Sequence, residues 1–351
     1  MPPTVAAFGQ TTDGVDVQLF TLVNAHGLRA TISNYGGTLT SLLVPGRTGQ
    51  PGEVVLGFDD VRGYQSAAFR RANPYFGALI GRYANRLAHG RCVLAGKVVE
   101  VTKNDGPHAL HGGNRGFDQR VWQATPGTSP EGQCLTLTYL SPDGEEGYPG
   151  NLRVRVVYTL TPANALRIAY TALTDQPTPL NLTQHTYFNL SHGYSPTVLH
   201  HRLRLPADRY TVVDARRIPT GELRPVAGTP FDFTTPHAIG ARLAQVPGGY
   251  DHNWVLNGSA PGLRPAATLY DPASGRRLEV FTDQPGLQLY TGNFLDGSLR
   301  GHGHTAYGQY AGLCLETQHF PDAPNHPHFP NTALHPGQVF RSVSEYRFGV
   351  S

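Results

Sequence analysis

Residues 152–173 read LRVRVVYTLTPANALRIAYTAL. Apolar and polar residues alternate through residues 152–160, the alternation breaks at Thr161-Pro162-Ala163-Asn164, and it resumes from Ala165. Alternation with a period of two points one face of a strand toward a core, and a break containing Pro and Asn between two such runs is typical of a turn. This stretch therefore predicts an antiparallel β-hairpin.

The same pattern returns along the chain. Residues 15–32 alternate around a break at 24–27, residues 91–101 fold back at Ala95-Gly96, residues 267–282 break at 271–275, and residues 339–348 form a last strand. Almost no window places apolar residues at helical spacing, although residues 59–65 suit one helical turn. The predicted fold class is mostly β: a large antiparallel sandwich or barrel-like array with few helices.

Composition agrees with this prediction and bounds the function. Among 351 residues, Gly 41 and Pro 29 are high, charged residues make up 15%, and Met occurs once, which favours short strands joined by turns. No linker, low-complexity tract or repeat divides the chain, so we expect one domain over residues 1–351. The net charge is only +3, without a cluster of Lys and Arg, and nucleic-acid binding is not expected.

The cysteines and the N-terminus bear on the compartment. Cys92, Cys134 and Cys314 are far apart and lack C-x-x-C spacing, so they read as buried thiols in a reducing compartment rather than as disulfides or zinc ligands. The N-terminus has no signal-peptide pattern, and no run of 18 apolar residues occurs. We expect a soluble cytoplasmic protein that does not engage a membrane.

A carboxylate stands in an unusual place near the C-terminus. Glu316 lies within the strand-like run LCLET, residues 313–317, just before a proline-rich loop. A charge in an apolar strand loses solvation, which raises the pKa of a carboxyl toward the range useful for a base. The alternative is a Glu on an edge strand that faces water.

Other candidate residues lie in the long loops between the predicted strands, where binding sites usually form. His185 and Tyr187 are two apart and would share one face of a strand. His111 precedes two glycines that permit close approach of a ligand. The polar residues suited to hydroxyl groups are Asn85, Arg86, Asp251 and Gln284. Each also has an ordinary structural interpretation, as a buried hydrogen-bonded His, a surface ion pair or a turn residue.

Two further patterns are weak. The sequence GHGHTA at 301–306 matches a dinucleotide-binding pattern but neither follows a clear strand nor opens a helix. His302 and His304, like His326 and His328, have H-x-H spacing, but they lie in Gly- and Pro-rich loops without an obvious carboxylate partner. We expect no metal and no cofactor.

With these residues in view, the sequence resembles the aldose 1-epimerase (galactose mutarotase) family over essentially its whole length. The matching stretches are NYGG (34–37), VLGF (55–58), IGRYANR (80–86), LHGG (110–113), DGEEGYPG (143–150), NLTQHTYFNL (181–190), DHN (251–253), QPG (284–286) with YTGNF (290–294), and LETQ (315–318) through PG (336–337).

The resemblance implies a β-supersandwich of antiparallel sheets with an open sugar cleft, no cofactor and a free aldose as substrate. It implies that His185 is the general acid and Glu316 the general base, with Tyr187 lining the site. It further implies that the groups holding sugar hydroxyls are Asn85, Arg86, His111, Asp251 and Gln284. Oligomeric state stays open between monomer and homodimer.

Two positions depart from the family pattern. Gln184 stands where the family usually has Asn, directly before His185, and this leaves the support of that histidine in question. Gly37 stands where Ala is more frequent.

Three other functions compete with epimerisation of free hexoses. A hexose-6-phosphate 1-epimerase of the same fold would need a cationic pocket, to which Arg70 and Arg71 could contribute. A glycoside hydrolase would need two carboxylates, for which Asp251 and Glu316 are the available pair. A sugar-binding module would keep the sugar-binding cleft but would not catalyse a reaction.

Overall fold

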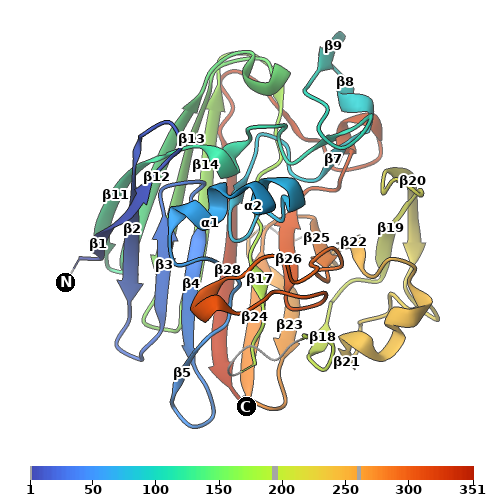
Figure 1. Cartoon of the computed structure of the whole chain (residues 1–351). Coiled ribbons are helices and arrows are strands. Elements are labelled where there is room, and N and C mark those ends of the chain that lie inside the picture. The colour runs from blue at the N-terminus through green and yellow to red at the C-terminus, as the bar shows by residue number, and fades with distance from the viewer. Residues whose placement is uncertain (1, 192–196, 259–261) are drawn as a thin grey trace.

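The computed structural model describes residues 2–191, 197–258 and 262–351. Every pairing between its named strands is antiparallel. Three larger sheets carry the architecture, and Figure 1 shows their long strands running side by side across the molecule. The fold is therefore the mostly β, antiparallel class that the alternating sequence predicts.

The largest sheet has nine strands and contains the hairpin predicted from residues 152–173. Its strands, in spatial order, are β11 (Gln123–Ser129), β12 (Gly132–Ser141), β13 (Leu152–Leu160), β14 (Ala165–Thr174), β28 (Phe340–Val350), β24 (Arg276–Thr282), β23 (Arg264–Tyr270), β18 (Arg202–Arg204) and β21 (His237–Ala238). The C-terminal strand β28 pairs with β14 and β24, so the end of the chain joins two parts of the sheet.

A six-stranded sheet faces part of this one. Its strands, in spatial order, are β17 (Tyr187–Phe188), β26 (Leu313–Gln318), β25 (Gly286–Tyr290), β22 (Asp251–Val255), β19 (Arg209–Val213) and β20 (Pro219–Pro225). Strand β26, which carries Glu316, is flanked on both sides, so the alternative of an edge strand facing water is wrong.

The N-terminal part forms a five-stranded sheet, coloured blue in Figure 1. Its strands are β1 (Thr4–Gln10), β2 (Asp16–Val23), β3 (Arg29–Ser33), β4 (Leu39–Pro45) and β5 (Pro51–Glu53). Short pairs complete the fold: β6 (Leu79–Ile80) with β16 (Thr183–Gln184), β7 (Arg86–Leu87) with β10 (Ala109–Leu110), β8 (Arg91–Leu94) with β9 (Lys97–Glu100), and β15 (Thr178–Pro179) with β27 (Ala333–Leu334).

Helices are few and short among the described residues. The two α-helices are α1 (Val61–Gln65) and α2 (Ala67–Ala72). The 3-10 turns are η1 (Ala88–Gly90), η2 (Phe117–Gln119), η3 (Glu145–Gly147), η4 (Ile239–Gln245), η5 (His302–His304) and η6 (Ala323–Asn325). The sequence predicts α1 but not α2. Ser66 separates the two helices: it is the C-cap of α1 and the N-cap of α2, where its side chain accepts a hydrogen bond from the backbone N–H of Phe69.

The main core lies between the sheets and draws on chain from Phe20 to Phe348. It collects alternate residues of β12, β13, β24, β25 and β26, as period-two burial requires. No described helix is long and apolar enough to cross a membrane. Cys92 and Cys314 are buried thiols as predicted, whereas Cys134 is half-buried; all three are free.

Candidate active site

Strand β26 places Glu316 on the face opposite the main core. Leu313 and Leu315 point into the core, while Cys314 and Glu316 alternate onto the other face. The Glu316 side chain is only 2% exposed. Strand alternation thus commits a carboxylate to a buried position.

The neighbouring strands supply further polar groups on that face. In the register of the sheet, Glu316 lies opposite Gln288 of β25, which lies opposite Asn253 of β22. Directly paired residues of antiparallel strands point to the same side. Tyr290 likewise pairs with Cys314 and with Asp251, so the six-stranded sheet builds a polar surface from three strands.

His185 lies between β16 and β17, not on the single strand expected from its spacing to Tyr187. Its backbone N–H donates to the carbonyl of Ala78 at 2.9 Å. Its Nε2 is 3.6 Å from Glu316 Oε1, and its Nδ1 is 3.5 Å from the Cys314 sulfur. A histidine and a carboxylate 131 positions apart in sequence therefore meet in the fold.

Gln184 supports this position despite its departure from the family pattern. Its Nε2 donates to the carbonyl of Gly77 at 2.8 Å, and its Oε1 accepts from the backbone N–H of Thr186 at 3.1 Å. The Gln184 amide thus links the two residues that flank His185, Gln184 and Thr186, to the loop that contains Gly77.

A second histidine lies beside the first. His111 has a left-handed backbone (φ 51°), and its Nδ1 accepts from the backbone N–H of Asn85 at 3.1 Å. The His111 ring is 5.2 Å from the ring of His185 and 4.6 Å from that of Tyr75, centroid to centroid. Contacts from two loops therefore fix its orientation.

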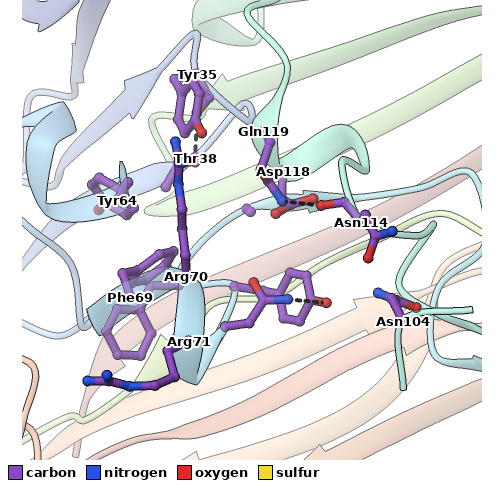
Figure 2. Close-up of a pocket in the computed structure, with 14 residues that line it drawn as sticks. Tyr35, Thr38, Tyr64, Phe69, Arg70, Arg71, Asn104, Asn114, Asp118 and Gln119 are labelled. Carbon is purple, nitrogen blue, oxygen red and sulfur yellow. Dashed lines mark hydrogen bonds between the residues drawn. The ribbon is translucent and has the colours of Figure 1, made fainter. Parts of the chain in front are cut away.

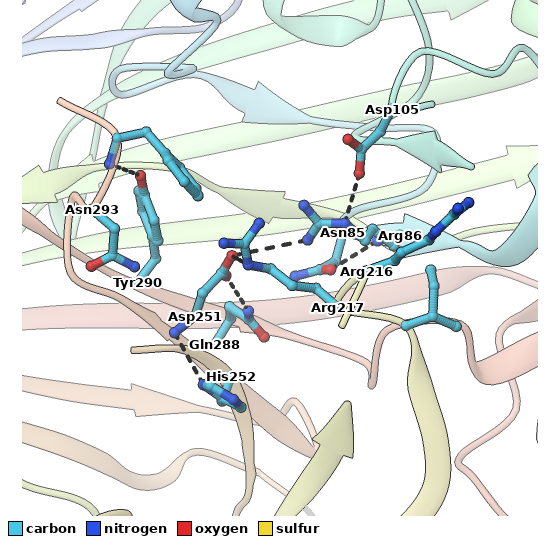
Figure 3. Close-up of polar contacts among 12 residues, drawn as sticks. Asn85, Arg86, Asp105, Arg216, Arg217, Asp251, His252, Gln288, Tyr290 and Asn293 are labelled. Carbon is cyan, nitrogen blue, oxygen red and sulfur yellow. Dashed lines mark hydrogen bonds and ion pairs between the residues drawn. The ribbon is translucent and has the colours of Figure 1, made fainter. Parts of the chain in front are cut away.

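Asp251 is held by three side chains, as Figure 3 shows. Gln288 Nε2 donates to its Oδ1 at 2.8 Å, Arg217 Nε is 3.1 Å from its Oδ2, and Arg86 Nη1 is 4.0 Å from the same oxygen. Arg86 also binds Asp105 through Nε at 2.8 Å. The result is a rigid, charged wall.

These groups surround one cleft, which opens to solvent. Of the predicted site residues, the cleft is lined by Asn85, Arg86, His111, His185, Tyr187, Asp251 and Glu316. Aromatic side chains that we did not predict, Tyr75, Tyr290 and Phe294, form much of the remaining wall. The site therefore combines polar groups suited to hydroxyls with aromatic rings, as small-molecule pockets commonly do.

The prediction for Gln284 requires correction. Gln284 does not line the cleft: its Nε2 donates to Ser342 Oγ at 2.8 Å, and its Oε1 is 2.8 Å from His319 Nδ1. It precedes β25, whereas Gln288 lies within that strand, opposite Glu316. Neither glutamine lines the cleft, but Gln288 donates to Asp251, which does line it, and Gln284 makes no such contact.

Burial sets the protonation of the central pair. Burial, and then the charge of Asp251, raises the pKa of Glu316 well above its usual range. Burial lowers the pKa of His185 to about 4 and that of His111 well below its ordinary value. Both shifts favour uncharged side chains, so Glu316 and His185 hold one proton between them across the neutral range.

Two groups of described residues are close enough to hold a small cation. The ligand atoms of His111, His185 and Glu316 lie within 4.8 Å of one another, as do those of His200, His201 and Asp271. The H-x-H pairs singled out in the sequence are engaged otherwise: His302 contacts Asp59 and the carbonyl of Thr40, and His328 contacts the carbonyl of Gly221.

Comparison with known proteins agrees with this geometry. The family model described as aldose 1-epimerase matches residues 18–347. Human galactose mutarotase is 44% identical over 350 residues and 99% of each chain, and Escherichia coli aldose 1-epimerase is 38% identical over 343 residues and 96% of each chain. The crystal structure of galactose 1-epimerase from Lactobacillus acidophilus superposes with a TM-score of 0.86 at 30% identity, covering 99% of both chains. The chain belongs to the aldose 1-epimerase family.

Proposed function

We propose that this protein is an aldose 1-epimerase that interconverts the α and β anomers of free hexoses such as galactose and glucose. The observation that carries this function is the Glu316–His185 pair, with 3.6 Å between Oε1 and Nε2, in a polar cleft. Anomer exchange needs one base and one acid, and the pair supplies one of each.

In the proposed mechanism, the one proton that the pair shares lies on His185 when the sugar reacts, so that ionised Glu316 takes the proton of the C1 hydroxyl while protonated His185 gives a proton to the ring oxygen. The C1–O5 bond breaks, the sugar becomes an open-chain aldehyde, and rotation about C1–C2 presents the other face. As the ring closes, Glu316 gives its proton to the C1 oxygen and His185 takes a proton back from the C5 hydroxyl. Because the roles reverse within each turnover, a pair that shares one proton suits the reaction.

The other residues of the cleft bind and orient the sugar in this proposal. Asn85, Arg86, His111 and Asp251 supply donors and acceptors for hydroxyl groups, Gln288 holds Asp251 from behind the cleft wall, and Tyr187 lines the site. Residues from Phe20 to Phe348 contribute to a single hydrophobic core, which supports the proposal that residues 1–351 form one domain. We further propose that the protein acts as a monomer or homodimer in a reducing compartment.

The phosphorylated-sugar alternative is less well supported. Arg70 and Arg71 of α2 line a neighbouring pocket, together with Tyr35, Asp118 and Gln119, rather than the cleft. Figure 2 shows their side chains leaving the helix in different directions. Two guanidinium groups that do not converge make a poor phosphate site.

The hydrolase alternative also lacks a free second carboxylate. Both oxygens of Asp251 already have partners, Gln288 on one and Arg217 on the other. A residue so held suits binding better than proton transfer to a leaving group.

The test is polarimetry of freshly dissolved α-D-galactose at neutral pH, with wild type, Glu316→Gln and His185→Asn. We expect each substitution to lower kcat by about 10²- to 10⁴-fold and to change KM much less. Including EDTA tests the expectation that no metal takes part.

Wild-type turnover in Glu316→Gln would contradict the assignment of the base. Loss of activity on chelation would contradict the metal-free mechanism. Acceleration with glucose 6-phosphate but with no free aldose would favour the phosphorylated-sugar alternative, and sugar binding without turnover would favour a binding module.

A further inference from the structure

Arg217 contacts Asp251, which lines the cleft, from a turn that no motif singled out in the sequence includes. The turn joins β19 to β20 and is held by Asp214, which accepts from the backbone N–H groups of Arg216 and Ile218 at 2.8 and 3.0 Å. Arg217 itself has a left-handed backbone (φ 62°). In Figure 3 its side chain points toward Asp251, whereas that of Arg216 points away.

Arg217 is the cation nearest to Asp251. Its Nε lies 3.1 Å from Asp251 Oδ2, compared with 4.0 Å for Arg86 Nη1. Arg86 is shared with a second carboxylate, Asp105, at 2.8 Å. Arg217 therefore makes the closer of the two cation contacts to Asp251, and among the described residues it forms no ion pair with a second carboxylate.

Arg217 also holds the aromatic rim of the cleft. Its guanidinium carbon lies 4.7 Å from the centre of the Phe294 ring, a cation–π arrangement. Phe294 is 60% exposed and stacks on Tyr290, with ring centres 6.1 Å apart. One side chain thus joins the charged wall to the rim, although it is not itself among the lining residues.

We propose that Arg217 is a positioning residue for the epimerase reaction, fixing Asp251 to receive a sugar hydroxyl and offsetting its negative charge beside the Glu316–His185 pair. The inference rests on the proposed function. Without Arg217, the Oδ2 atom of Asp251 would lose its closest partner, and the carboxylate would present a less compensated charge to the base.

The sign of the electrostatic effect follows from the contacts. The charge of Asp251 already raises the pKa of Glu316, after the larger effect of burial. Removing a nearby cation makes protonation of the Glu316–His185 pair easier and so raises both of its apparent pKa values. The acidic and the basic limb of the pH–rate profile, which these two values set, therefore both move to higher pH. The other titratable or charged groups around the two carboxylates are Tyr75, Arg86, His111, His185, His252, Tyr187, Tyr290, Cys314 and Tyr346. All of these remain in place when position 217 alone is changed.

The experiment compares the full pH profile of galactose mutarotation for wild type, Arg217→Gln, Arg217→Lys and Arg216→Gln. We expect Arg217→Gln to shift both limbs upward by about 0.5 to 1 pH unit and to raise KM about fivefold to tenfold. Arg217→Lys keeps the charge and should restore the wild-type limbs. Arg216→Gln removes the same charge from the same turn without contact to Asp251 and should behave as wild type.

A second comparison tests whether the effect passes through Asp251. In an Asp251→Asn background, adding Arg217→Gln should raise KM no further, because the contact that it breaks has lost its charge. An undiminished KM effect in that background would overturn the inference.

The inference also fails if Arg217→Gln and Arg216→Gln give the same pH profile, or if Arg217→Gln lowers kcat uniformly without moving either limb. Activity of the wild type on a free aldose separates this failure from failure of the proposed function.

Discussion

At the scale of single residues, the site depends on burial. Glu316 and His185 would each carry their ordinary charge state in water, but 2% and 6% exposure of their side chains favours the neutral forms. Cys314 contributes to the same environment, because its buried thiol has a pKa well above the usual value and stays protonated beside His185 Nδ1. The protonation states of Glu316 and His185 are therefore set by burial and by neighbouring groups rather than by the residue types alone.

The two glutamines give a prediction at this scale. Gln288→Ala should raise KM for galactose about tenfold, because it removes the amide that binds Asp251 and stands opposite Glu316. Gln284→Ala should leave KM unchanged and instead lower stability by about 1–3 kcal/mol, because it breaks buried hydrogen bonds to Ser342 and His319.

Steady-state polarimetry and urea denaturation of both variants would measure these effects. A rise in KM for Gln284→Ala, with none for Gln288→Ala, would restore the assignment made from the sequence.

At the scale of elements, the turn between β3 and β4 explains the departure at Gly37. This residue has φ +55°, and a Cβ added to it would lie 2.3 Å from Leu79 Cδ1. Its carbonyl also accepts a hydrogen bond from the Tyr158 hydroxyl at 2.8 Å. The packing of Leu79 and the left-handed backbone together require glycine here.

Gly37→Ala should consequently destabilise the protein by about 2–4 kcal/mol, combining backbone strain with overpacking. Gly49→Ala is a matched control, because Gly49 also has positive φ (+76°) but no atom within 4 Å of an added Cβ. Its expected cost is only about 1 kcal/mol. Trp122 and Trp254 are both buried and report unfolding in urea by fluorescence. Equal midpoints for the two variants would refute the packing argument.

At the scale of the whole molecule, buried histidines link stability to pH. Burial lowers the pKa of His201 to about 3 and the pKa values of His185, His252 and His319 to about 4. The unfolded chain, with ordinary pKa values near 6.5, binds more protons than the folded chain below that pH. Stability contributed by these groups is therefore present above about pH 6.5 and is lost as pH falls toward about 4.

Three carboxyl groups act in the opposite direction. Burial raises the pKa of Asp118 to about 7 and also raises the pKa values of Glu316 and Asp322, so all three bind protons more readily in the folded state. Because the histidines outnumber them, the free energy of unfolding should fall between pH 7 and pH 5, by a few kcal/mol in order of magnitude. Urea denaturation followed across this range measures the change, and constant or rising stability toward pH 5 would contradict it.

The sequence by itself determined the strands and most of the residues of the site. Period-two alternation fixes which side chains of β13, β14 and β26 enter a core, because this pattern depends only on local backbone geometry. The short motifs identify His185, Glu316, Asn85, Arg86, His111, Tyr187 and Asp251, all of which line one cleft.

The tertiary structure alone decided the rest. The contact of Gln288 with Asp251, which Gln284 does not make, depends on how β25 pairs with its neighbours, and the contact of Arg217 with Asp251 depends on a turn packed beside another strand. The protonation of the Glu316–His185 pair depends on burial by several elements at once. These contacts and pKa shifts depend on groups that are distant in sequence and come together only in the fold, so no local sequence pattern predicts them.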